Sequence, residues 1–459
     1  MDTKQLRQKI LDLAIRGKLV PQDPNDEPAS VLLERIKAEK ERLIAEGKIK
    51  RSKKSAPSSD KPHYADWDLP NGWMWCLVDD FAYVAAGSTP SKDAFVETGI
   101  PYIKMYNLRN QQIDFDFRPQ YIKEDVHNGK LKRSRTEIGD LIMNIVGPPL
   151  GKLAIIPDSL LQSNFNQAAV LIRPLLHKKI IVKYLFYYLS QMSEINSIST
   201  KGSAGQVNIS LTQSQNMRIA LPPLQEQQRI VNEIEHLWKC LDHIDEEARN
   251  LNNAVERIKT KLLESAIMGK LVAQDPSDEP AVDLLKRLNP NAVVSADTSH
   301  YGQLPDGWCY TTMYFISQLY DGEKIEDKNL INLDAKYLRG KSEGNILNKG
   351  RFVPEKTTMI LVDGENSGEI FTAPIDGYQG STFKLLNISE EMNAEYVKII
   401  IRIYQKRLRD NKVGSAIPHL NKKMFREILV PVPPFAEQLR IVERTNELMS
   451  KIAVLTEAL

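Results

Sequence analysis

The segment Gly147-Pro-Pro-Leu-Gly-Lys152 is the nearest match in this sequence to a phosphate-binding loop. A P-loop reads Gly-x-x-x-x-Gly-Lys followed by Ser or Thr, because backbone N–H groups and a hydroxyl must hold the phosphates and their magnesium ion. Here the spacing is one residue short, the two prolines have no N–H to donate, and Leu153 replaces the hydroxyl residue. The segment therefore does not predict nucleotide binding.

Two other patterns fall short of a catalytic or metal site. Pro433-Pro434-Phe435 is similar to the loop of an amino-methyltransferase, but Val432 stands where that loop needs Asn or Asp, and the prolines open a helix. His236 and His243 lie seven residues apart on the outer face of a predicted helix, which favours a solvated pair over two metal ligands. Neither a dinucleotide-binding fingerprint nor a Gly-x-Ser-x-Gly elbow occurs. The sequence predicts no catalysis and no bound metal.

The strongest pattern is a long helix, from Leu224 to Met268, with no internal proline or glycine. Its apolar residues alternate steps of four and three, which is the heptad spacing of a helix that buries a narrow seam against another helix. About 45 residues at a rise of about 1.5 Å form a rod of roughly 65–70 Å. The seam residues are Ile230, Ile234, Leu237, Leu241, Ile244, Leu251, Val255, Ile258 and Leu262.

A partner helix is present in two pieces, at the two ends of the chain. Leu221–Val231 recurs as Val432–Val442, and Leu6–Ala29 recurs as Ile258–Ala281 with fifteen of 24 positions identical. In this alignment residue 459 matches 248 and residue 1 matches 253. We therefore expect a two-fold repeat opened inside its second rod, with the first and last helices stacked end to end. The second seam comprises Ile441, Leu448, Ile452, Leu455, Leu6 and Ile10.

Length and composition indicate several ordinary globular domains. The chain has 459 residues, 42% hydrophobic residues and a formal net charge of +2, which is too small to predict strong non-specific binding to nucleic acid. Its three widely separated cysteines favour a reducing compartment over a disulfide framework. No apolar run approaches 18 residues and the N-terminus lacks the apolar core of a signal peptide, so we expect a cytoplasmic protein with no membrane partner.

Two α+β domains of different sequence are expected within this repeated frame. Short alternating runs predict strands at 75–84, 102–105, 140–146, 153–156 and 168–172, followed by a helix over 179–192. A second set at 309–319, 335–338, 358–362, 369–373 and 382–386 precedes a helix over 394–409. The predicted segments are 1–20 (helix completing the second rod), 21–68 (turn, helix and basic linker), 69–222 (first domain), 223–270 (central long helix), 271–303 (turn and linker), 304–433 (second domain) and 434–459 (C-terminal helix).

This order of parts resembles the specificity subunit of a type I restriction–modification enzyme. The resemblance covers nearly the whole chain, and its most specific elements are Pro222-Pro223-Leu-Gln-Glu226-Gln and Pro433-Pro434-Phe-Ala-Glu437-Gln. It implies two target recognition domains, each reading one half of an asymmetric, bipartite DNA site, separated by an antiparallel two-helix coiled-coil spacer. It also implies a non-catalytic chain that docks methyltransferase subunits, two in number, and restriction/translocase subunits. The assembled complex would be an adenine DNA methyltransferase and ATP-dependent endonuclease, and AdoMet, ATP and Mg would be bound by the partners.

Base recognition needs side chains with hydrogen-bond donors and acceptors, and phosphate binding needs cations. Residues of these types at strand ends or in loops are the candidates for contact with double-stranded DNA. In the first domain they are Ser88, Thr89, Lys104, Asn107, Arg109, Asn144, Lys152, Asn166, Gln167 and Gln206. In the second domain they are Lys336, Arg339, Lys341, Glu365, Asn366, Ser415, His419 and Asn421.

Other interpretations of these patterns remain open. Each candidate residue alone is also consistent with an ordinary solvated loop. The basic run from Lys48 to Lys54 is typical of a solvated tether, although it could touch DNA phosphates, and the stripe Lys398, Arg402, Lys406 and Arg409 fits a solvated helix face equally well. A different class of function is a coiled-coil scaffold that binds protein partners without DNA specificity. Copurification with a methyltransferase and sequence-dependent DNA retention distinguish the two.

Overall fold

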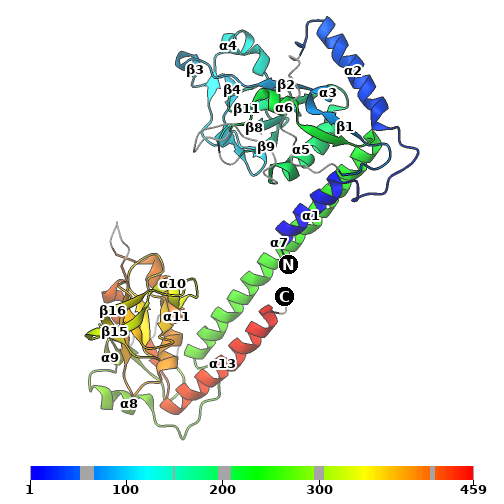
Figure 1. The fold of residues 1–459 in the computed structure, drawn as a ribbon. Helices are drawn as coiled ribbons and strands as arrows, with labels where there is room; N and C mark the ends of the chain where they lie inside the picture. Colours follow the sequence, from blue (N-terminus) through cyan, green and yellow to red (C-terminus); the bar gives the residue numbers. More distant parts are fainter. Residues whose placement is uncertain are drawn as a thin grey trace. The chain divides into compact units, whose positions relative to one another are not determined.

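The computed structural model describes residues 2–51, 67–147, 150–194, 208–293, 304–413 and 419–457. The chain divides into two compact units, Met1–Glu247 (unit 1) and Ala248–Leu459 (unit 2). The boundary falls inside α7 (Leu224–Ile267), a continuous helix of 44 residues that is drawn in green in Figure 1. The prediction of one long uninterrupted helix is thus confirmed. Because the first and last helices belong to different units, their end-to-end stacking stays a prediction.

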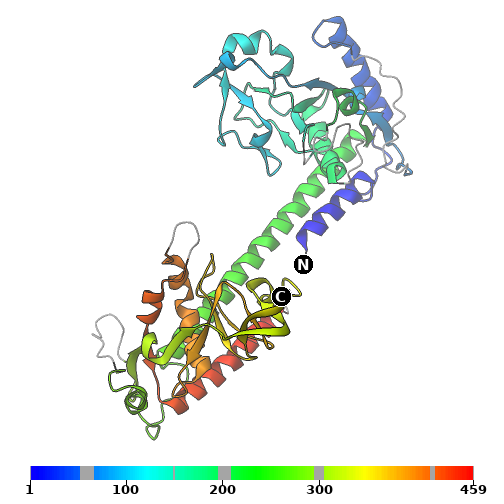
Figure 2. The ribbon, with the colours of Figure 1, turned by 60° about the vertical axis from the view of Figure 1, so that its left-hand side comes forward.

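Unit 1 begins with two helices, α1 (Thr3–Ile15) and α2 (Ala29–Ala45). Figures 1 and 2 both show α1 lying along the first half of α7. The Oγ1 of Thr3 donates to Asp245 Oδ1 at 2.8 Å, and a guanidinium nitrogen of Arg7 donates to Asp242 Oδ1 at 2.8 Å. These polar bonds fix α1 against α7 beyond the apolar contact.

The first globular domain, domain 1 (residues 69–222), is built around the antiparallel sheet β2-β11-β8-β9. A second sheet has the order β10-β4-β7-β3, with β10 parallel to β4, and β1 pairs with β12. Its strands are β1 (Met74–Leu77), β2 (Ala82–Ala86), β3 (Phe95–Val96), β4 (Ile100–Ile103), β5 (Leu108–Arg109), β6 (Gln112–Ile113), β7 (Tyr121–Ile122), β8 (Leu141–Asn144), β9 (Leu153–Ile155), β10 (Asn164–Phe165), β11 (Ala169–Pro174) and β12 (Arg218–Leu221). Its helices are α3 (Val78–Phe81), η1 (Lys92–Ala94), η2 (Met105–Asn107), α4 (Glu124–Asn128), η3 (Lys132–Ser134), α5 (Lys178–Glu194) and α6 (Leu211–Gln215).

Unit 2 repeats this plan in its own globular domain, domain 2 (residues 304–433). The sheet β14-β20-β17-β18 has the same order as β2-β11-β8-β9, and β13 pairs with β21 as β1 pairs with β12. Its strands are β13 (Cys309–Thr312), β14 (Ser317–Tyr320), β15 (Lys324–Leu333), β16 (Ile346–Val353), β17 (Thr358–Leu361), β18 (Ile370–Thr372), β19 (Gly377–Gln379), β20 (Phe383–Ile388) and β21 (Leu429–Val432). The helices of unit 2 that follow α7 are α8 (Ala281–Leu288), α9 (Met313–Ile316), α10 (Ala335–Leu338), α11 (Ala394–Asp410), α12 (Lys422–Arg426) and the C-terminal α13 (Phe435–Glu457).

Local structure departs from the predicted strands at three places. The predicted strands 75–84 and 309–319 are each interrupted by one helical turn, α3 and α9, at the same point of the repeat. The predicted strand 335–338 is wrong, because these residues form α10, whose first amides donate to the side chain of Asp334. An Asp at an N-cap favours a helix over a strand. The long antiparallel pair β15–β16 was not predicted.

Burial along the predicted seam is uneven. Ile230, Ile234, Leu241, Leu262 and Ile441 are buried, and Leu237, Val255, Leu448, Ile452 and Ile10 are half-buried. In contrast, Leu6, Ile244, Leu251, Ile258 and Leu455 are exposed by 38–65%. The prediction that these five residues are covered is wrong for the chain alone.

The apolar face of α1 also differs from the prediction. Leu11, Ala14 and Ile15 are buried in the main cluster of unit 1, whereas Leu6 is 38% exposed. The reason is that α1 contacts α5 of domain 1 as well as α7. Because α1 packs against both helices, its buried residues differ from those that the heptad spacing predicts.

Candidate nucleic-acid interface

A buried carboxylate joins each globular domain to its long helix. In unit 1, Trp73 Nε1 donates to Glu226 Oε2 at 2.9 Å, and Gln22 Nε2 donates to Glu226 Oε1 at 3.1 Å. Arg229, one turn further along α7, pairs with Asp26. The side chain of Glu226 is 1% exposed, and burial raises its pKa against the lowering effect of the Gln22 and Trp73 hydrogen bonds. We call this set of contacts the carboxylate clamp.

Unit 2 contains the same clamp at the repeated positions. Trp308 Nε1 donates to Glu437 Oε2 at 2.9 Å, Gln274 Nε2 donates to Glu437 Oε1 at 3.1 Å, and Arg440 pairs with Asp278 at 2.6 Å. Each clamp also needs a glycine, Gly17 or Gly269, with a φ of +65°. A Cβ at Gly17 would lie 2.4 Å from Pro70, and one at Gly269 would lie 2.3 Å from Pro305. The repeated sequence motifs therefore encode one way of mounting two different domains.

In domain 1, three separate segments bring five of the predicted DNA-binding residues together. The amide of Ser88 donates to Phe165 O at 3.1 Å, and the amide of Asn166 donates to Ile103 O at 3.1 Å. Gly87 is required here, because a Cβ would lie 2.0 Å from Asn166 O. We call the residues at this junction the β2–β4–β10 corner: Ser88, Thr89, Lys104, Asn166 and Gln167.

The corner presents polar groups on a rigid base. The hydroxyl of Tyr102 donates to Ser88 O at 2.9 Å, and burial raises the pKa of Tyr102 to about 12 despite a hydrogen bond with Thr89. Lys104 follows β4 directly, with its ammonium 5.5 Å from the Phe95 ring centroid. Thr89 and Gln167 are exposed, so the corner offers a hydroxyl and an amide beside the cation of Lys104, whereas Asn166 Oδ1 is buried without a hydrogen-bond partner.

Two of the predicted residues in domain 1 have structural roles instead. Asn107 is 1% exposed: its amide donates to Asp114 O and Phe117 O, and its Oδ1 accepts from Lys104 N at 2.9 Å. Asn144 is 4% exposed, and its Oδ1 accepts from Lys152 N at 3.0 Å. A side chain with all its groups engaged in the interior cannot also read a base. We therefore correct both predictions.

The remaining predicted residues of domain 1 lie away from the corner or outside the described residues. Arg109 is exposed on the β5–β6 hairpin, with its guanidinium 4.1 Å from the Phe117 ring centroid and 3.6 Å from Asp114. Lys152 is exposed on the loop between β8 and β9. Gln206, and Ser415 of domain 2, lie outside the described residues.

In domain 2 the predicted residues fall into exposed and engaged groups. Lys336, Lys341 and Asn366 are exposed. Arg339 pairs with Glu369, Glu365 pairs with Lys412 at 2.8 Å, and His419 Nδ1 lies 2.6 Å from Asp363 Oδ1. Asn421 is the N-cap of α12 and accepts from Met424 N at 3.0 Å, so its predicted DNA contact is replaced by a capping role.

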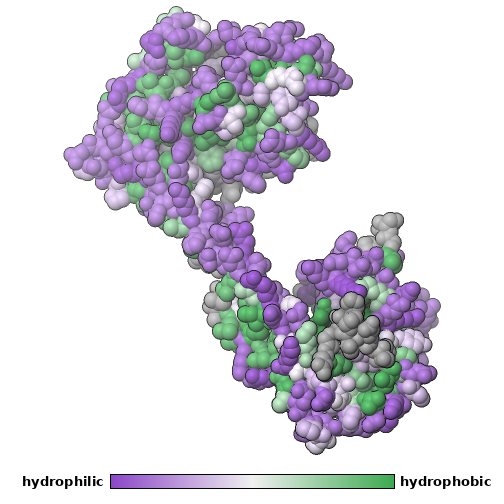
Figure 3. All heavy atoms as spheres, turned by 180° about the vertical axis from the view of Figure 1, so that it is seen from behind, coloured by the Kyte–Doolittle hydropathy of each residue, from purple (hydrophilic) through white to green (hydrophobic). Residues whose placement is uncertain are grey.

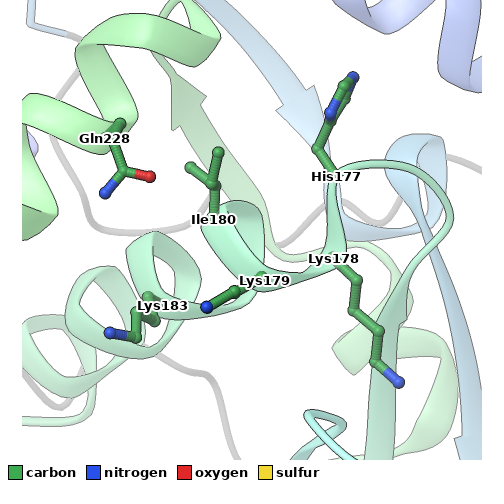
Figure 4. Close-up of a pocket in the computed structure, with 6 residues that line it drawn as sticks. All are labelled: His177, Lys178, Lys179, Ile180, Lys183 and Gln228. Atoms are coloured by element: carbon green, nitrogen blue, oxygen red, sulfur yellow. The ribbon is translucent and has the colours of Figure 1, made fainter.

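Two groups of basic residues are partly engaged in contacts within the chain. Lys398 is 6% exposed and bonds to Glu395 and Thr372, so the predicted stripe on α11 is not continuous on the surface. A cavity of about 430 Å³ lies between the start of α5 and α7 (Figure 4). Its lysines are partly neutralised, since Lys178 pairs with Asp140 at 2.7 Å and Lys183 with Glu235 at 2.6 Å.

Sequence patterns missed two exposed features that the structure makes plain. Arg133, in η3, donates from Nη2 to Ser88 Oγ at 3.3 Å and so joins the β2–β4–β10 corner. In domain 2 the β15–β16 pair exposes Lys328, Lys349 and Ile346, the last at 70%. Alternation of apolar residues could have revealed this pair, but a register shift between Glu326 and Leu330 breaks the pattern.

Comparison with known proteins decides the family. The model of the type I restriction–modification DNA specificity domain matches residues 70–257 and 320–458. The chain belongs to this DNA specificity family. The first matched region spans nearly all of domain 1 and most of α7, and the second spans domain 2 from residue 320 onward and all of α13.

Relatives within the specificity family are similar over different extents. The chain is 25% identical to the type I restriction enzyme EcoAI specificity subunit of Escherichia coli, over 97% of this chain and 89% of that protein. It is 30% identical to the EcoEI specificity subunit of Escherichia coli, over 63% of this chain and 55% of that protein. A chain from a structural study of complex assembly in a type I R-M system has the same fold, with a TM-score of 0.57, 17% identity and coverage of 85% of this chain and 94% of that one.

Family membership is accompanied by two negative observations. No helix among the described residues is long and apolar enough to cross a membrane. In the same described part of the chain, no group of three or more His, Cys, Asp or Glu side chains is placed to hold a metal ion. The family assignment identifies a chain that specifies DNA sequence for a type I restriction–modification system.

Proposed function

We propose that each globular domain reads one half of an asymmetric, bipartite DNA site. The observation that carries this proposal is the contrast between an identical clamp and different reading surfaces. Glu226 and Glu437 make the same hydrogen bonds, whereas the place of Ser88 and Thr89 in domain 1 is taken by Glu323 and Lys324 after β14 in domain 2. Different donors and acceptors select different base edges. The two domains would therefore read different sequences.

Partner docking is proposed on the exposed parts of the helical frame. Figure 3 shows a hydrophobic surface on the C-terminal part of α13, where Val454 and Leu455 are 63% and 65% exposed. A groove of about 500 Å³ along α7 is lined by apolar residues that include Ile258 and Leu262 and by the basic residues Arg257, Lys261 and Lys270. Apolar surface of this kind marks an interaction site, because covering water-exposed Leu and Ile side chains with a partner lowers the free energy of the complex.

The repeated frame supports a proposal about the number of partners. Because the carboxylate clamp occurs twice, we propose that the chain docks two methyltransferase subunits in equivalent ways, together with restriction/translocase subunits. AdoMet, ATP and Mg would be bound by those partners, and this chain would contribute recognition alone. The scaffold alternative has no support from the family match, which is to a DNA specificity domain.

Copurification and DNA retention test this function. The full-length chain is coexpressed with a methyltransferase subunit of a type I restriction–modification system and purified through a tag on this chain. The purified sample is then passed over immobilised duplexes of random sequence and of sequence methylated in the expression host. The proposal predicts a stable complex and retention that depends on sequence. A chain that purifies alone, or a complex that holds all duplexes equally at every salt concentration, would support the scaffold alternative.

A further inference from the structure

Arg133 occupies a distinctive position among the charged residues of domain 1. It is exposed, and the contact that fixes its guanidinium is the 3.3 Å hydrogen bond from Nη2 to Ser88 Oγ. Two other arginines of domain 1 make more contacts within the chain. Arg135 donates to His127 O and to Asn128, and Arg173 pairs with Asp140 at 2.6 Å. Arg133 thus reaches the polar corner, and no carboxylate of the described residues forms an ion pair with it.

The base of η3 holds this arginine in place. Ser134, the next residue, is fully buried, and its hydroxyl donates to Leu131 O at 3.1 Å and accepts from Asn164 Nδ2 at 3.0 Å. Asn164 belongs to β10, which pairs with β4 at the same corner. The backbone that carries Arg133 is therefore tied to the strand that directly precedes Asn166. A guanidinium fixed from below in this way loses little freedom when it binds.

The hydrogen-bonding groups of a guanidinium indicate which base Arg133 would bind. A guanidinium presents two parallel N–H donors that match the O6 and N7 acceptors of guanine in the major groove, and this is the commonest specific contact between an arginine and a base. Lys104 and Thr89 belong to the same corner and could hold a phosphate, since a cation and a hydroxyl are typical phosphate contacts. The exposed amide of Gln167 supplies a further donor and acceptor for a base edge.

We propose that Arg133 is the specificity-determining residue for a guanine in the half-site read by domain 1. This inference rests on the proposed function, because it assigns one base position to a domain that reads DNA. Ser88 is a positioning residue for the guanidinium, and it need not touch the base itself. In domain 2 Glu323 and Lys324 take the place of Ser88 and Thr89, so the proposal concerns domain 1 alone.

Mapping of methylated adenines tests the inference in the intact complex. Wild type and Arg133→Ala are coexpressed with the methyltransferase subunit in a host without adenine methylation. Arg133→Ala should keep the domain 2 half-site and lose the requirement at one G·C pair in the other half, with discrimination there falling roughly 10–100-fold. Arg133→Lys keeps the charge but not the fork, and should relax the same position to a smaller degree.

Lys132→Ala is the matched control, because Lys132 is exposed in the same turn and should affect all sequences alike. The inference is overturned if Arg133→Ala leaves the motif unchanged, relaxes an A·T position, or weakens every site equally as Lys132→Ala does. Absence of any methylated motif with the wild-type complex would instead refute the proposed function. Thermal unfolding of both variants confirms that the comparison is between folded proteins.

Discussion

Trp73 Nε1 donates a hydrogen bond of 2.9 Å to Glu226 Oε2 across 153 residues of chain, and Trp308 and Glu437 repeat the bond at 2.9 Å in unit 2. The acceptor carboxylates are 1% exposed in both units. A bond between a domain and the first turn of its helix fixes the angle at which the domain leaves the frame. Two equal bonds therefore mount two unequal domains alike.

Breaking the clamp should destabilise its unit. Trp73→Phe keeps most of the apolar volume and removes the donor, leaving a buried carboxylate oxygen with one partner fewer. The expected loss is on the order of 1–3 kcal/mol in the free energy of unfolding. Denaturant unfolding checks the value, and Trp308→Phe should cost a similar amount. Equal stability of wild type and both variants would contradict the structural role of the clamp.

The pH dependence of stability should carry the signature of Glu226. Burial raises its folded-state pKa above the ordinary value near 4.5, so the folded state binds a proton more readily than the unfolded state. The associated stability is present below the unfolded pKa and is lost as pH rises through the folded pKa. Glu226→Gln should therefore be relatively more stable than wild type above that window than below it. A difference between the two proteins that does not change with pH would argue against this assignment.

Two leucines of α1 distinguish its buried face from its exposed one. Leu11→Ala removes a side chain from the core of unit 1 and should cost about 2–5 kcal/mol. Leu6→Ala, at a position 38% exposed, should change stability by no more than about 0.5 kcal/mol. Chemical denaturation of the full chain measures both. A larger cost for Leu6→Ala would restore the simple heptad seam as the buried face.

Docking on the exposed helical surface can be tested without disturbing the fold. Leu455→Asp introduces a charge at a position that is 65% exposed, so the chain should remain as stable as wild type. Copurification of the methyltransferase subunit should fall at least about 10-fold, because burial of a charge at an interface is costly. Leu161→Asp, at a position 72% exposed on domain 1, is the control and should leave copurification unchanged. Equal recovery with both variants would place the partner elsewhere.

A phosphate contact by Lys104 should be visible in the salt dependence of DNA binding. Lys104→Ala should weaken binding to all duplexes similarly and reduce the slope of log affinity against log salt by about 1. Binding is measured by fluorescence anisotropy at several salt concentrations. Unchanged affinity at low and high salt would remove the end of β4 from the interface.

The frame was predictable from sequence because its signals are local and repeated. The heptad run of α7, the proline pairs and the Gly-Lys-Leu-Val turns each depend on residues close together in the chain. The Trp73–Glu226 bond was not foreseen, because nothing local marks a Trp and a Glu 153 residues apart as partners. The predicted burial of Ile258 and Leu455 is wrong for this chain alone, since apolar periodicity does not reveal whether the covering helix is in the same chain.

The DNA-binding site was only partly predictable. Ser88, Lys104 and Asn166 were chosen as polar residues near strand ends, and the pairing of β4 with β10 places their segments together. Asn107 and Asn144 met the same criterion, but their amides complete backbone hydrogen bonds in the interior. Arg133 was missed, because its link to Ser88 depends on how η3 folds back over β2. Residue type and local position do not distinguish a side chain that faces inward from one that faces DNA.

Single-molecule mapping of methylated adenines by the wild-type complex tests the central claim most directly. Two domains mounted alike on one helical frame should produce a single motif with two different half-sites at a constant separation. Exchange of residues 69–222 for the corresponding domain of another family member should then change one half-site and leave the other and the separation unchanged. A continuous motif, a variable separation, or a change in both half-sites on exchange would contradict the account.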